Sequence, residues 1–279
     1  MKLTKACINI IKWVFIGIIL IFTVYPILYT LLGSFKTNWE LTSGGSFLPK
    51  KWMFSNYAQA YLQSNFLQYS INSILISGIS MIVALLTSSM AGYIFARHTF
   101  PGKKILISSY LAMMFISLGA VSIYPIYILF HKIGLTKSFL GLALALTGSQ
   151  ATNVFLTVGF VKSIPVSMDE AAYLEGCSYL TIFYKIIIPL IRPILGVIAL
   201  FAFRYAWNDY LIGLIMTISN PDLMPITVAV VQLKYSMNAA AEWHIMLAGA
   251  SLAIVPILIL YIFTNRQFIS GLTAGAVKE

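Results

Sequence analysis

Few residues in this chain could carry out catalysis or hold a metal ion. Of its 279 residues, only eight are acidic and three are histidines. His98, His131 and His244 are scattered, and no HExxH pattern places two histidines on one helical face. The sequence also has no G-x-x-x-x-G-K-[ST] phosphate-binding loop. It therefore predicts no catalytic centre, and no metal or nucleotide bound by this chain.

A different set of residues could bind a polar ligand. Trp207 and Asn208 follow Arg204 by three and four residues, which predicts one shared helical face. Arginine, amide and indole groups bind a sugar through hydrogen bonds to its hydroxyls and apolar stacking on its ring. Alternatively, Arg204 pairs with an acid of a partner subunit, and Trp207 and Asn208 hold the helix in place. A charge within an apolar helix needs either such a partner or a wet cavity, so both interpretations stay open.

The acidic residues are concentrated in the segment SMDEAAYLEG, 167–176, which contains Asp169, Glu170 and Glu175. Ser167 followed three residues later by Glu170 matches a capping box, which begins a helix. Gly176 is a typical helix end, so the pattern predicts a two-turn helix over 168–175. Two turns are not stable alone in water. We therefore expect this helix to dock against another structure.

A second helix is predicted directly after it, in CSYLTIFYKIIIPLIRP. An apolar stripe at i, i+3, i+4 and i+7 consists of Tyr179, Ile182, Phe183 and Ile186. Ala172 and Gly176 offer a small surface that permits close approach. Together the two helices form a hairpin over 163–187, called the 163–187 hairpin below.

Long apolar runs dominate the rest of the chain. It is 59% hydrophobic and 9% charged, whereas a soluble domain has about 25% charged residues. A helix needs roughly 20 apolar residues to cross a bilayer, and lipid offers no partner for unpaired backbone groups. We predict an all-α integral membrane protein with six transmembrane helices, near 13–34, 68–96, 105–130, 138–161, 188–214 and 243–264.

Small residues recur at four-residue spacing within these spans, which favours close packing of helices in lipid. They are Ser88 and Gly92; Gly141, Ala145 and Ser149; and Gly249 and Ala253.

The positive charges indicate the orientation of the spans. With six alternating spans, one side receives Lys2, Lys5, Lys12, Arg97, Lys103, Lys104, Lys162, Lys185, Arg192, Arg266 and Lys278. The positive-inside rule places this side, with both termini and the 163–187 hairpin, in the cytoplasm. The net charge of +10 is thereby accounted for by topology and indicates no nucleic acid partner. Cys177 lies on the reducing side, so no disulfide is expected.

The stretch EAAYLEGCSYLTIFYKIIIPL resembles the EAA loop in the membrane subunits of binding-protein-dependent ABC importers. Six residues match that pattern in register: Glu170, Ala171, Ala172, Gly176, Ile186 and Pro189. Glu175, Cys177 and Ile188 stand where the family more often has Asp, Ala and Leu. The segments YIFARHTFPGKK, WNDYL and RQFISGLTAGAVKE also resemble the maltose-type carbohydrate permeases of this family.

The resemblance implies a single permease domain over 1–279 with a type I ABC importer fold in the bacterial cell membrane. It implies a second, non-identical permease subunit, two cytoplasmic ATPase subunits that bind ATP and Mg, an extracellular solute-binding protein and a carbohydrate substrate. The short helix becomes the coupling helix that moves the spans when the ATPases close. The residues expected to dock the ATPase are Glu170, Ala171, Ala172, Tyr173, Gly176, Leu180 and Phe183.

Two other functions compete with this interpretation. An ion-coupled secondary sugar transporter would need acids within its spans, and Asp209, near an outer end, is almost the only one. A membrane scaffold would use the packing residues but not a docking hairpin.

Overall fold

A computed structural model describes residues 2–44, 46–115, 119–148, 150–235 and 241–276. Every regular element in these ranges is a helix, apart from one isolated bridge between Tyr235 and Ala241. The prediction of an all-α chain is confirmed for this part. Ser149 and Lys278 lie outside the described residues, as do the side chains of Lys2, Lys5 and Arg266.

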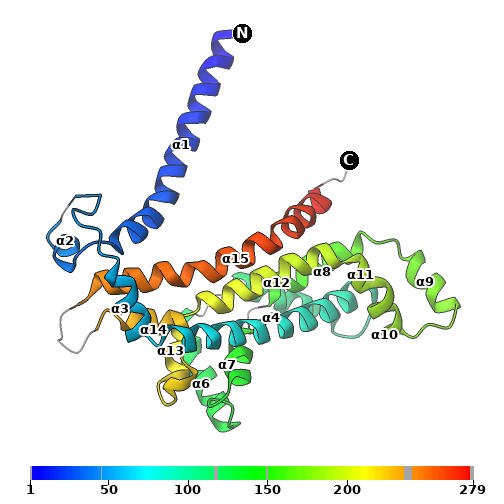
Figure 1. The fold of residues 1–279 in the computed structure, drawn as a ribbon. Coiled ribbons are helices and arrows are strands. Elements are labelled where there is room, and N and C mark those ends of the chain that lie inside the picture. The colour runs from blue at the N-terminus through cyan, green and yellow to red at the C-terminus, as the bar shows by residue number, and fades with distance from the viewer. Residues whose placement is uncertain (1, 45, 116–118, 149, 236–240, 277–279) are drawn as a thin grey trace. The chain divides into compact units, whose positions relative to one another are not determined.

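The chain divides into two compact units. The first unit combines residues 1–67 with 229–255. It contains α1 (Lys2–Gly33), α2 (Asn38–Thr42), α3 (Ser55–Gln63), the end of α14 (Ile226–Gln232) and the beginning of α15 (Trp243–Ala276) (Figure 1). The apolar window of α1 has a mean hydropathy of 2.3 and buries none of its residues within the chain, which is typical of a helix that faces lipid.

Side-chain amides hold the non-helical parts of this unit in place. Asn56 donates to the carbonyls of Ser34 and Lys36, at 2.8 and 2.9 Å, and so fixes the chain where it leaves α1. Asn38 donates to the carbonyl of Ala241 at 2.8 Å and accepts from the backbone N–H of Trp243 at 3.1 Å. Backbone groups that no helix satisfies are thus paired by side chains.

The second unit, residues 68–228 with 256–279, contains most of the helices. Its long helices are α4 (Phe66–Arg97), α5 (Lys103–Phe115), α8 (Ala151–Lys162) and α12 (Arg192–Asn208). Shorter helices complete it: η1 (Gly119–Ser122), α6 (Ile123–Lys132), α7 (Phe139–Leu146), α13 (Leu211–Thr217) and η3 (Pro221–Leu223).

The small residues do permit close helix packing in this unit. A β-carbon added to Gly92 of α4 would overlap the side chain of Thr157 in α8. One added to Gly141 would overlap the backbone of Leu135, which lies in the segment before α7 and not in another helix. Only glycine therefore lets these backbones approach so closely.

The predicted spans are more broken than their apolar runs suggested. By length and composition, two helices in the described residues could cross a membrane, α1 and α4, and up to four could if each bent pair forms one span. The bent pairs are α7 with α8, at 67°, and 179–190 with α12, at 83°. The run predicted as one span over 105–130 is divided between α5 and α6, and the run over 188–214 breaks after Asn208.

Candidate functional site

The predicted hairpin is present between α8 and α12. It consists of α9 (Ser167–Leu174), α10 (Tyr179–Ile182), a π-helical segment η2 (Phe183–Ile187) and α11 (Ile188–Leu190). In Figure 1, α9 and α10 lie at the end of the second unit opposite α13. The hairpin therefore projects from one end of the long helices of this unit.

The prediction of a capping box at Ser167 is wrong. The N-cap is Val166, which already has helical dihedral angles, and no side chain caps the helix. The carbonyl of Pro165 accepts the N–H of Met168, and that of Val166 accepts those of Asp169 and Glu170. Because the turn begins before Ser167, this residue lies inside the helix, where its hydroxyl cannot cap the first amides.

The predicted helix end at Gly176 is confirmed. Gly176 has a φ of +85°, a conformation that favours glycine. Its N–H donates to the carbonyl of Tyr173, and the N–H of Cys177 donates to that of Ala172, each at 3.0 Å. These two bonds form a Schellman motif, which satisfies the last carbonyls of α9 and turns the chain toward α10.

The second helix departs from the predicted stripe at both ends. Ile182 and Phe183 are buried, but Tyr179 is exposed and Ile186 is only partly buried. Ile187, outside the stripe, is fully buried. A π-helical turn uses i→i+5 spacing, so the inward position five residues after Ile182 falls on Ile187.

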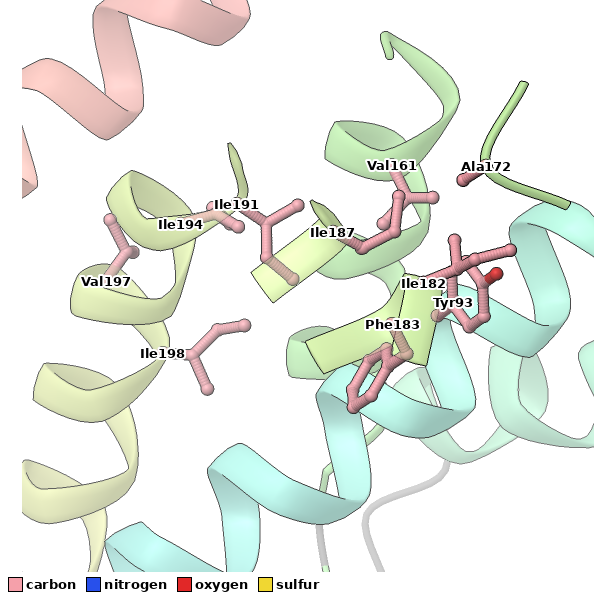
Figure 2. Packing of buried hydrophobic residues seen from close by; sticks show 10 residues of the cluster. All are labelled: Tyr93, Val161, Ala172, Ile182, Phe183, Ile187, Ile191, Ile194, Val197 and Ile198. Carbon is pink, nitrogen blue, oxygen red and sulfur yellow. The ribbon is translucent and has the colours of Figure 1, made fainter. Parts of the chain in front are cut away.

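A hydrophobic cluster lies beneath the hairpin. It joins Tyr93 of α4, Val161 of α8, Ala172 of α9, Ile182 of α10 and Phe183 of η2, and Figure 2 shows these side chains close together. The cluster continues into α12 through four further buried residues: Ile191, Ile194, Val197 and Ile198. Ala172 and Phe183, two of the predicted docking residues, are therefore buried within the chain and attach the hairpin to it.

The opposite face of the hairpin is exposed and largely apolar. Glu170, Ala171, Tyr173, Gly176 and Leu180, the other five predicted docking residues, are all exposed. Several large exposed apolar side chains of the hairpin were not among the predicted docking residues, and they include Leu174, at 87%, and Tyr184. The sequence did contain a signal for Leu174. It is an apolar residue just before the predicted helix end at Gly176, on a short helix with acids on both sides of it.

One ion pair connects the hairpin to α4. The guanidinium Nε of Arg97 lies 2.6 Å from Oδ2 of Asp169. Arg97 also donates through Nη2 to the carbonyl of Ile164, at 2.9 Å. In the sequence Arg97 is only a topology signal, because no local pattern pairs it with an acid as distant along the chain as Asp169.

The structure brings Arg204 and Asn208 together but not Trp207. Arg204 and Asn208 are exposed and line a pocket of about 300 Å³, with Tyr205, Asp209, Tyr210 and Leu211. Trp207 is only 2% exposed and stacks on Phe203, with ring centroids 5.7 Å apart. The prediction that all three residues share one face is therefore wrong for Trp207, which packs into the core.

The break after α12 has a clear physical cause. Oδ2 of Asp209 accepts the backbone N–H of Gly213, at 2.8 Å, near the beginning of α13. The backbone carbonyl of Asp209 accepts the hydroxyl of Thr227 at 2.6 Å. Asp209 therefore ends one helix and stabilises the next.

Across the described residues, no group of three or more His, Cys, Asp or Glu could hold a metal ion.

Apolar helices of membrane-spanning length, together with a hairpin packed on α4, α8 and α12, are typical of a multi-pass helical membrane protein. The family of binding-protein-dependent transport system inner membrane components matches residues 2–268, and the chain belongs to this family.

Individual relatives cover nearly the whole chain. The maltodextrin transport system permease protein MdxG of Bacillus subtilis (strain 168) is 30% identical over 99% of this chain and 97% of the relative. The arabinooligosaccharides transport system permease protein AraQ of Halalkalibacterium halodurans is 31% identical over 91% of each chain. The fold is also similar to a chain in the crystal structure of a bacterial ABC transporter involved in the import of the acidic polysaccharide alginate. The TM-score is 0.79 at 22% identity, over 95% of this chain and 98% of that one.

Proposed function

We propose that this chain is the permease subunit of an ATP-driven importer of a sugar or oligosaccharide. Membership of the family supports the transport role, and relatives named for maltodextrin and arabinooligosaccharide transport support a carbohydrate substrate. The observation that carries the proposal is the exposed apolar face of the 163–187 hairpin, around Tyr173, Leu174 and Leu180.

This face has the properties of a protein interface. Large apolar side chains that stay exposed outside the lipid-facing spans mark a site where another protein binds. Tyrosine is enriched among the residues that contribute most to binding at such an interface. Because the underside of the hairpin is packed on α4, α8 and α12, a force applied to the exposed face is passed to these helices. We assign the face to a cytoplasmic ATPase subunit, with Glu170, Ala171, Tyr173, Gly176 and Leu180 in contact and Ala172 and Phe183 supporting them.

The remaining parts of the assembly follow from this assignment. Two ATPase subunits bind ATP and Mg, and this chain binds neither. A second, non-identical permease subunit completes the pathway, and an extracellular binding protein delivers the sugar. In this arrangement the chain has six spans, both termini lie in the cytoplasm, and ATP binding and hydrolysis alternate the pathway between its outward-facing and inward-facing states.

The pocket beside Arg204 is our candidate for sugar contact. In the described residues, no carboxylate lies within ion-pair distance of Arg204, so its charge is available to a ligand or to an acid of the second permease. Asn208 adds an amide, and Tyr205 and Tyr210 add rings.

The test is reconstitution of the complete transporter in liposomes, with uptake of a labelled oligosaccharide as the readout. We expect uptake that requires ATP on the ATPase side and is insensitive to proton or sodium gradients. Leu174→Glu should abolish retention of the ATPase, whereas Lys104→Met, which changes an exposed cation outside the hairpin, should not. Uptake by this chain alone, driven by an ion gradient without ATP, would instead identify a secondary transporter.

A further inference from the structure

Three segments of the chain meet at the base of the 163–187 hairpin. Arg97 is the last residue of α4, and Asp169 lies in the first turn of α9. Their ion pair, at 2.6 Å, joins these two helices. The hydrogen bond from Arg97 to the carbonyl of Ile164 adds the segment that leads from α8 into α9. One guanidinium therefore connects the end of α4 to the beginning of the hairpin at two points.

Because this ion pair is buried, each of its charges depends on the other for compensation. The side chains of Arg97 and Asp169 are 6% and 14% exposed, whereas exposed pairs are screened by water and salt and contribute little. The other carboxylate oxygen of Asp169 is buried without a hydrogen-bond partner in the described residues. Asp169 thus depends on Arg97 to compensate its charge. Without the guanidinium, a buried carboxylate remains that is stabilised only when α9 moves toward water.

Aromatic rings form a second connection at the same place. The ring of His98 contacts Tyr93 and Tyr179 edge to face, with centroids 5.5 and 5.1 Å apart. Tyr179 in turn stacks on Tyr173 of α9, at 5.6 Å. These contacts hold both helices of the hairpin against the end of α4, in the orientation that the ion pair requires.

We propose that Arg97 is a positioning residue that clamps the coupling hairpin to α4, so that α4 moves with the hairpin. The proposal rests on the function proposed above. α9 has only eight residues, and a helix of two turns has little stability of its own. The hydrophobic cluster already packs the hairpin on α4 through Tyr93, and the Arg97–Asp169 clamp adds a charged contact that fixes the first turn of α9 to the end of that helix.

Exchanging the two charges separates the clamp from a general effect on folding. In the reconstituted transporter we compare Arg97→Met, Asp169→Asn and the exchanged pair Arg97→Asp with Asp169→Arg. Lys104→Met, which removes an exposed cation near the same end of α4, is the matched control. Coupling free energies between two sites are typically about 5–150-fold, and we expect each single variant to lower ATP-driven uptake by about tenfold while the ATPase stays bound. The exchanged pair restores opposite charges but not the hydrogen bond to Ile164, because a carboxylate at residue 97 cannot donate, so it should recover part of this loss relative to Arg97→Met.

Two results would overturn the clamp. Single variants that transport as well as Lys104→Met would show that the pair does not position the hairpin. An exchanged pair no better than Arg97→Met, which also lacks the hydrogen bond to Ile164, would show that restoring the opposite charges does not restore the clamp.

Hydrogen exchange of the purified full-length chain gives a readout that does not depend on transport. We expect the amides of 167–176 to exchange faster in each single variant and to regain protection in the exchanged pair. Unchanged protection would refute the clamp. If protection changes as expected but the unmodified transporter shows no ATP-driven uptake, the clamp stands and the proposed function fails.

Discussion

Replacing Gly176 tests whether the end of α9 positions the docking surface. A β-carbon at this residue would meet no atom within 4 Å, so space does not limit the substitution. Its cost comes from the φ of +85°, which is unfavourable by about 1–2 kcal/mol for most L-residues. Asparagine and aspartate tolerate this conformation better than alanine does. Because about 1.4 kcal/mol corresponds to a factor of ten, Gly176→Ala should open the Schellman motif about tenfold more often.

Three substitutions separate backbone strain from charge. Gly176→Ala adds mostly strain, Gly176→Asn adds a side chain with less strain, and Gly176→Asp is close in shape to Asn but adds a negative charge. Exchange of the Cys177 amide, which donates to the carbonyl of Ala172, should be faster in Ala than in Asn. Sugar-stimulated ATPase activity should fall furthest in Asp, because the charge enters the apolar docking face. Unchanged sugar-stimulated ATPase activity in Gly176→Asp would refute the assignment of this face to the ATPase.

Three further substitutions test other parts of the structure. Arg204→Ala should raise the KM for sugar while the complex still assembles, whereas loss of the complex with an unchanged KM would indicate pairing with the partner permease. Gly92→Ala should lower the thermal midpoint in detergent, because its β-carbon would clash with α8 and overpacking costs about 1–3 kcal/mol. Gly78→Ala, in open space on the same helix, should leave the thermal midpoint unchanged. Equal midpoints for the two variants would contradict this packing. Hydrogen bonds from backbone N–H groups, the largest from Lys50, lower the pKa of Glu40. The contribution of Glu40 to stability is therefore present above the ordinary glutamate pKa and lost as the pH falls through the lowered pKa of Glu40. Acid should then increase proteolysis of the loop over 34–54. Glu40→Gln should remove that pH dependence.

Sequence patterns predicted the hairpin well where the structure is set by a single residue. Gly176 ends α9 because its φ is accessible mainly to glycine, and this preference needs no tertiary contact. The start of α9 depends instead on Pro165 and Val166, which take up a helical turn before Ser167 is reached. The capping box was a valid local pattern, but the preceding turn displaced it by one residue.

Longer-range features could not be predicted in the same way. Arg97 and Ile164 are 67 residues apart in sequence, and only the fold brings them together. The π-helical turn at Phe183–Ile187 has no apolar pattern of its own and is visible only as a change in which isoleucine is buried. Apolar composition likewise predicted helices in lipid but not their breaks. Asp209, which is partly buried and stabilises the next helix, looks in sequence like a single charge near the end of a span.

The two candidate sites lie at opposite ends of α12. Its 17 residues span about 25 Å at 1.5 Å per residue, from the bend at Ile191 to the pocket residues Arg204 and Asn208. Ile191 is fully buried, and Ile194, Val197 and Ile198 continue the cluster that holds the hairpin, so the first half of α12 and the hairpin share one core. Packed cores deform little, and we therefore expect the hairpin and α12 to move together. A displacement at the docking face would then reach the pocket through a single rigid helix, while Arg97 carries the same displacement to α4.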